Sequence, residues 1–149
     1  MLNDGSGYTA PREGRTTIES LLREGVEYLG MSASAIEHSV AMRMIDLRGV
    51  HVSMIPLVKD DEMNEHDLVL AAPLSGVHVR SQQALEFLFE INLANMLAGA
   101  GAFGCDKEGN LLLLKAMRSN QLDGMALAAH VQWMVALVES VRDELRRLH

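Results

Sequence analysis

The stretch LFEINLANMLAGAGAFGCDKEGNLLLL, residues 88–114, changes its pattern at its glycines. Before them, apolar residues recur at helical spacing without a run of β-branched residues. After them come a short apolar segment, the turn sequence DKEGN and a leucine-rich segment that is too short for a helix. The stretch therefore predicts a helix that ends at Gly99, followed by a two-stranded hairpin.

The same glycines have the spacing of a dinucleotide-binding loop, since Gly99, Gly101 and Gly104 form a G-x-G-x-x-G pattern. That loop works only after a strand and before a helix, because the helix N-terminus faces the phosphates. Here the order is reversed. Asp123 lies about 20 residues further on, where a ribose-binding acid is expected, but the residues between read as strand and turn. We predict that the spacing is accidental and that no cofactor binds.

The helix that enters the glycines, residues 81–98, has two apolar arcs. The first arc consists of Ala84, Phe87, Leu88, Ile91, Ala94 and Ala98. The second consists of Leu85, Phe89, Leu93 and Met96, with Asn92 at its margin. One small domain readily covers only one such face, so the second arc predicts a partner helix and, most economically, a symmetric homodimer. A central helix buried within one chain is the alternative.

Two further helices flank the strands. Thr16 and Glu19 have the spacing of a capping box, and Gly30 is expected to end the first helix. Asp123 is expected to cap the last helix, whose apolar stripe is Leu127, Val131, Met134, Val138, Val141 and Leu145. Trp133 lies off that stripe, as a packed edge residue or as a contact for a partner.

Alternating residues predict three strands between the first two helices. Val40, Met42 and Met44 would share one face, as would Val50, Val52 and Met54, with a turn at Arg48 and Gly49. Residues 68–74 form the third strand, which is expected to end near Pro73. The order helix, three strands, helix, two strands, helix predicts an α+β fold with a twisted antiparallel sheet. Residues 16–149 would form one domain after a flexible tail of residues 1–15.

The composition narrows the range of partners and cellular locations that we expect for this protein. The chain of 149 residues has a formal net charge of −7, which argues against nucleic acid and anionic lipid as partners. Its single cysteine, Cys105, is expected to be a buried strand residue in a reducing compartment. Without a secretory signal or an apolar run of membrane-spanning length, we expect a cytoplasmic protein that does not insert into membranes. Ten methionines suit either a core or a surface that accommodates varied protein partners.

No residue pattern indicates catalysis or a metal site. No serine or cysteine lies in a nucleophile elbow, and no histidines have the spacing of metal ligands. The acidic segment 59–67 fails as a calcium loop, because Glu65 stands at the required glycine and Ala71 at the required glutamate. We expect a solvated loop there.

Residues 88–131 resemble the class I type III secretion chaperones, the Tir chaperone family. The resemblance lies in the Leu-x-x-x-Asn-Leu helix, the glycine-containing strand, the acidic turn, the leucine-rich strand and the LDGMAL segment that opens the last helix. It implies a small acidic homodimer with the middle helix at its interface. Such a dimer holds the N-terminal region of a secreted effector in an extended state, without nucleotide hydrolysis.

An extended client is expected to pair with a sheet edge and to place side chains in apolar pockets. The candidate pocket residues are those in strands with more apolar residues than one buried face requires: Met42, Met44, Met54, Ile55, Leu112 and Leu114. Two alternatives remain, a regulator of the same fold and a small-molecule enzyme that uses the glycine segment.

Overall fold

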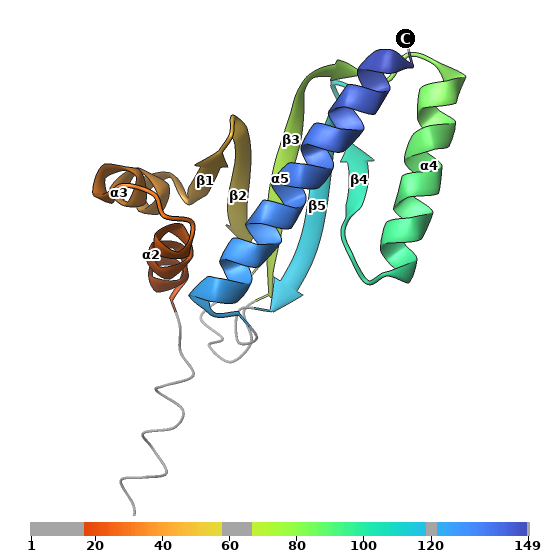
Figure 1. The fold of residues 1–149 in the computed structure, drawn as a ribbon. Helices are drawn as coiled ribbons and strands as arrows, with labels where there is room; N and C mark the ends of the chain where they lie inside the picture. Colours follow the sequence, from red (N-terminus) through yellow and green to blue (C-terminus); the bar gives the residue numbers. More distant parts are fainter. Residues whose placement is uncertain (1–16, 58–66, 119–121, 149) are drawn as a thin grey trace, which may run out of the picture.

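The computed structural model describes residues 17–57, 67–118 and 122–148 (Figure 1). The helices are α2 (Ile18–Tyr28), α3 (Ala33–Met42), α4 (Gln82–Leu97) and α5 (Gly124–Arg147). The strands are β1 (Met44–Leu47), β2 (Val50–Pro56), β3 (Asp67–His78), β4 (Ala102–Cys105) and β5 (Asn110–Arg118). The tail 1–15 and nearly all of the acidic segment 59–67 lie outside the described residues.

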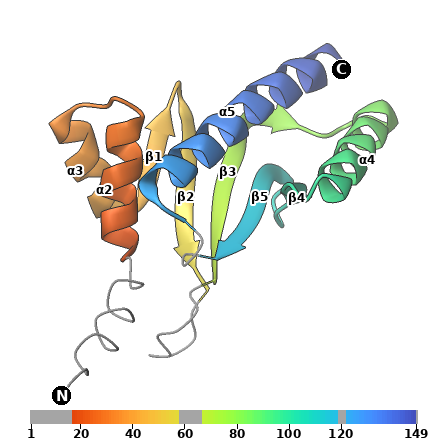
Figure 2. The same cartoon turned by 60° about the horizontal axis from the view of Figure 1, so that its bottom comes forward.

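The five strands form one antiparallel sheet in the order β1-β2-β3-β5-β4, which confirms the α+β fold. Helix α5 crosses one face of the sheet, which we call the inner face (Figure 1). Helices α2 and α3 lie at the β1 end, and α4 lies beside β4 at the other end, as Figure 2 also shows. The opposite, outer face has no described helix across it.

The core lies between α5 and the inner face of the sheet. Every residue of the apolar stripe expected on α5 is buried, and so are Val52, Leu70 and Leu113 on the strands below it. Among the described helices, α5 alone has the length and hydropathy of a membrane span, although it is the core helix of this fold. Helix α5 therefore packs on the sheet as part of the core.

Capping side chains fix where the helices begin. Asp123 accepts a hydrogen bond from the amide of Ala126 at 2.8 Å, which confirms the expected start of α5. Helix α2 is capped by Thr17, whose hydroxyl accepts from the amide of Ser20, rather than by the expected Thr16. Gly30 and Gly99 follow the ends of α2 and α4 with positive φ, a conformation that glycine adopts without strain.

Residues 33–42 form a helix, so the prediction of a strand through Val40 and Met42 was wrong. The hydroxyl of Ser32 accepts from the amide of Ala35 and starts α3. Arg43 ends it with φ 49°, and β1 begins at the next residue. Three alternating apolar residues are too few to exclude a helix, and only Met44 of the three lies in a strand.

Strand β3 continues past Pro73 to His78, beyond its expected end. Pro73 still lies opposite Leu112, and the register shifts between Pro73 and His78. Gly76, with φ 78°, lies within this irregular part. Pro73 itself stays in register and the irregularity comes after it, so the proline does not end the strand.

Candidate functional site

The second arc of α4 is a row of exposed apolar side chains. Leu85, Phe89, Leu93 and Met96 have exposed fractions between 47% and 69%, and the adjacent Leu97 reaches 82%. On the first arc, Ala84 and Leu88 are buried, while Phe87 and Ile91 are half-buried against the core. The chain thus covers the N-terminal part of the first arc, while Ala94 and Ala98 of that arc and the whole second arc are exposed.

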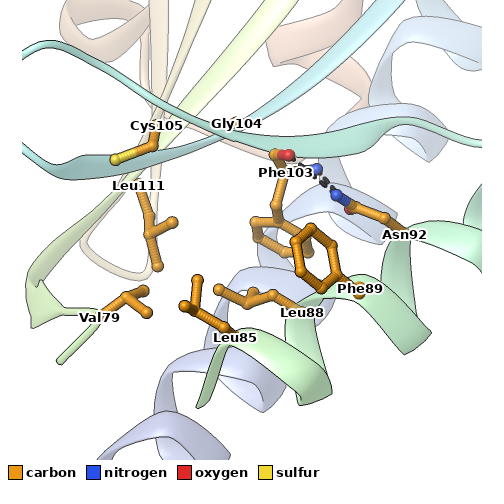
Figure 3. Close-up of a pocket in the computed structure, with 9 residues that line it drawn as sticks. All are labelled: Val79, Leu85, Leu88, Phe89, Asn92, Phe103, Gly104, Cys105 and Leu111. Atoms are coloured by element: carbon orange, nitrogen blue, oxygen red, sulfur yellow. Dashed lines mark hydrogen bonds between the residues drawn. The ribbon is translucent and has the colours of Figure 1, made fainter. Parts of the chain in front are cut away.

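Asn92 points toward β4 rather than along that exposed row (Figure 3). Its Oδ1 accepts a hydrogen bond from the amide of Phe103 at 2.7 Å, and its Nδ2 donates to the carbonyl of Phe103 at 3.0 Å. One donor and one acceptor of the side-chain amide are therefore engaged with the main chain of Phe103. The sequence pattern gave no sign of this contact, because it placed Asn92 only at the margin of an arc.

A cavity of about 240 Å³ lies between α4 and the β4–β5 hairpin (Figure 3). Nine residues line it: Val79, Leu85, Leu88, Phe89, Asn92, Phe103, Gly104, Cys105 and Leu111. Leu85 and Phe89 belong to both the exposed row and this lining. Cys105 is exposed at the end of β4, so the expectation of a buried cysteine was wrong. The strand is short and at the sheet edge, where only alternate residues face the core.

The glycines of the opening stretch have separate structural roles. Gly99 follows α4 with φ 70°. A Cβ at Gly101 would lie 2.3 Å from the carbonyl oxygen of Leu114, so this glycine allows β4 and β5 to approach closely. A Cβ at Gly104 would meet only the side chain of Leu114 at 3.9 Å. A helix enters this segment and a strand leaves it, the reverse of a phosphate-binding loop.

A row of residues runs across the outer face of the sheet. Met44 lies opposite Ser53, Ser53 opposite Ala71, Ala71 opposite Leu114, and Leu114 opposite Ala102. Neighbouring rows add the pairs Ile55 with Val69, Val69 with Ala116, and Pro73 with Leu112. Ile55 and Leu114 are exposed, and Leu112 is half-buried. The centre of the outer face is thus apolar, with the ion pair of Asp46 and His51 near its β1 edge, and no described helix covers it.

Of the six candidate client-contact residues, four belong to this outer face: Met44, Ile55, Leu112 and Leu114. Met42 lies apart, exposed at the end of α3 beside the start of β1. Met54 is in the core with 2% of its surface exposed, so it does not belong to a binding surface. It faces opposite to Ile55, because successive strand residues alternate between the two faces.

Lys115, His130 and Trp133 form a cluster between β5 and α5 that the sequence pattern missed. The Lys115 ammonium lies 3.1 Å from Nδ1 of His130 and 5.0 Å from the centre of the Trp133 ring. A charged lysine only donates, so Nδ1 of His130 is the acceptor and the ring proton lies on Nε2. Burial lowers the pKa of Lys115, and burial together with the Lys115 charge lowers the pKa of His130.

The described residues contain no group of three His, Cys, Asp or Glu side chains that would hold a metal ion. The rejected calcium-loop residues, apart from Ala71, lie outside the described part of the chain. The arrangement that remains is a set of apolar surfaces, one on α4 and one on the outer face of the sheet. Such surfaces suit contact with polypeptide.

Residues 47–142, more than half of the chain, match the Tir chaperone protein (CesT) family. The chain belongs to this family. No curated protein matches the sequence. The CesT match begins at the end of β1 and includes α4, the β4–β5 hairpin and most of α5. It confirms the resemblance drawn from residues 88–131, and CesT proteins are type III secretion chaperones rather than enzymes.

Proposed function

We propose that this CesT-family chain is a cytoplasmic, homodimeric chaperone. It would hold an extended N-terminal segment of a secreted effector in a secretion-competent state, without ATP hydrolysis. The observation that carries the proposal is the outer face of the sheet, which is apolar at its centre and covered by no described helix, next to the β1 edge, which pairs with no further described strand. Family membership supports this class of client, and the outer face supports a contact with an extended segment.

The outer face suits an extended client better than a folded one. Its exposed side chains, Ile55 and Leu114, come from strands on either side of β3, with the half-buried Val69 between them. A client segment that orders on binding loses chain entropy, so it needs a large contact area to compensate. A surface that continues over several strands provides that area, whereas a single pocket does not.

The β1 edge provides backbone groups for an added strand. The two-residue turn Arg48–Gly49 has positive φ at both positions, which makes Leu47 and Val50 a hydrogen-bonded pair. Alternation then turns the main-chain groups of Met44 and Asp46 away from β2. The amide of Met54 donates to the carbonyl of Arg43, as this register requires. A strand added at β1 would lie next to Met44 and thus beside the outer face.

The exposed row on α4 is the proposed dimer interface. Leu85, Phe89, Leu93 and Met96 are uncharged and exposed, so two copies of this acidic chain can bury apolar surface there. An isologous contact needs only one self-complementary surface. Asn92 bonds to Phe103 of the same chain, so it would hold α4 against β4 rather than contact the partner.

The proposal is tested by purifying the tagged protein from its native host and identifying the bound polypeptide by mass spectrometry. N-terminal fragments of that polypeptide, of about 50 to 100 residues, are then mixed with the chaperone and digested with protease. We expect Ile55→Asp and Leu114→Asp to abolish protection of the fragment. Met125→Asp, at an exposed apolar position of α5, is the matched control and should retain it. Unchanged protection in the first two variants would place the client elsewhere, and capture of no secreted protein would contradict the function.

A further inference from the structure

The sheet has two edges, β1 and β4, and each of these strands is four residues long. In an antiparallel ladder, the main-chain groups of alternate residues point away from the neighbouring strand. In β4 these residues are Phe103 and Cys105, because the amide and carbonyl of Phe103 bond to Asn92 on α4. At the β4 edge, the outward main-chain groups of Phe103 therefore already have hydrogen-bond partners.

The Asn92 side chain occupies the position of a neighbouring strand. A residue in such a strand would accept from the amide of Phe103 and donate to its carbonyl. Asn92 does both with one amide group, at 2.7 Å and 3.0 Å. Only Cys105 then retains outward main-chain groups within β4, and one residue is too few for a ladder.

The β1 edge has no such closure. Neither Met44 nor Asp46 receives a backbone hydrogen bond from another described segment, and no described side chain bonds to their main chain. Met44 also belongs to the apolar row of the outer face, so an added strand there would have side-chain contacts as well.

We propose that Asn92 closes the β4 edge to strand addition and so directs an incoming client strand to β1. This inference rests on the proposed function for the identity of the incoming strand. The closure itself is a property of the chain alone. Asn92 is thus a specificity-determining residue that acts through the main chain of β4, and it need not contact the client.

The test uses the whole protein without a client. Asn92→Leu keeps a side chain of similar size and removes both hydrogen bonds to Phe103. Asn95→Leu is the matched control, because Asn95 is on the same helix and its buried Nδ2 has no hydrogen-bond partner in the described structure. Hydrogen exchange at the amide of Phe103 reports the closure, with the amide of Leu113 as the reference. Sedimentation velocity and a ¹⁹F label on the single cysteine, Cys105, report pairing at the β4 edge.

We expect the amide of Phe103 to be protected in the unsubstituted protein and to exchange about tenfold faster in Asn92→Leu. That variant should form species larger than those of the unsubstituted protein, with a perturbed Cys105 label, because an open edge pairs with other copies. Asn95→Leu should not speed exchange at Phe103, form larger species or perturb the label. Unprotected Phe103 in the unsubstituted protein, or equal association of both variants, would overturn the inference.

If Asn92→Leu does not fold, Asn92→Asp tests the closure instead. Its carboxylate still accepts from the amide of Phe103 but cannot donate to the carbonyl of Phe103. Formation of species larger than those of the unsubstituted protein would support the closure, and their absence would overturn it. None of these results depends on a bound client. Failure to capture a secreted protein would therefore contradict the proposed function and leave the closure standing.

Discussion

The amide of Gly124 donates a hydrogen bond to Oε2 of Glu24 at 3.2 Å, so a side chain of α2 helps to cap α5. The two helices approach so closely that a Cβ at Gly124 would lie 2.2 Å from the Cβ of Glu24 and 2.8 Å from its carbonyl carbon. The glycine of the LDGMAL segment is therefore required by the contact between α2 and α5.

Gly124→Ala should destabilise the protein by about 2 kcal/mol, because the clash is with main chain and α2 has to shift. Thermal unfolding checks this, with an expected decrease in Tm of roughly 4 to 8 °C for a chain of this size. Gly104→Ala is the matched control, since its Cβ would make only an ordinary contact at 3.9 Å. Equal Tm values for the two variants would contradict the role of Gly124.

The long elements were predictable because their signals are local. The stripe from Leu127 to Leu145 and the cap at Asp123 depend only on helical periodicity and on side chains next to the helix start. Helix α3 was missed because Val40, Met42 and Met44 alternate for too few residues to exclude a helix. The end of β3 was missed because the strand continues past Pro73 through a register irregularity that the sequence pattern does not show.

The candidate surfaces were predictable only in part. The two apolar arcs of α4 follow from periodicity, but which of them is exposed depends on how the helix packs on the sheet. The contact of Asn92 with Phe103 and that of Lys115 with His130 join residues whose approach depends on packing between elements. Met54 was misassigned because alternation shows which residues share a face but not which face is buried.

Phe89→Glu and Leu93→Glu should each convert a dimer to monomer or aggregate, because a carboxylate in a desolvated apolar contact is unfavourable. Light scattering measures the state, and far-UV circular dichroism checks the fold. Met125→Glu, also at an exposed apolar helix position, should leave the dimer intact. If the dimer persists in both α4 variants, the interface lies on another surface.

No nucleotide should bind to the glycine segment. Gly99 ends a helix, Gly101 permits the contact of β4 with β5, and no helix N-terminus follows the glycines to face a phosphate. Calorimetric titration with NAD, FAD and ATP should show no saturable heat. Micromolar binding of any of the three would contradict this structural account of the glycines.

Acidification should destabilise the contact between α5 and β5 through His130. Burial and the nearby Lys115 charge lower the pKa of His130 in the folded chain, so the folded state binds fewer protons than the unfolded state does. The resulting stability is present above the unfolded pKa of about 6.5 and decreases as the pH falls below it.

Urea unfolding between about pH 7.5 and about pH 5 measures the slope of the free energy of unfolding against pH. His130→Gln should flatten it, and Lys115→Met should reduce it by removing the nearby cation. A slope equal in His130→Gln and the unsubstituted protein would show that other groups determine the acid sensitivity.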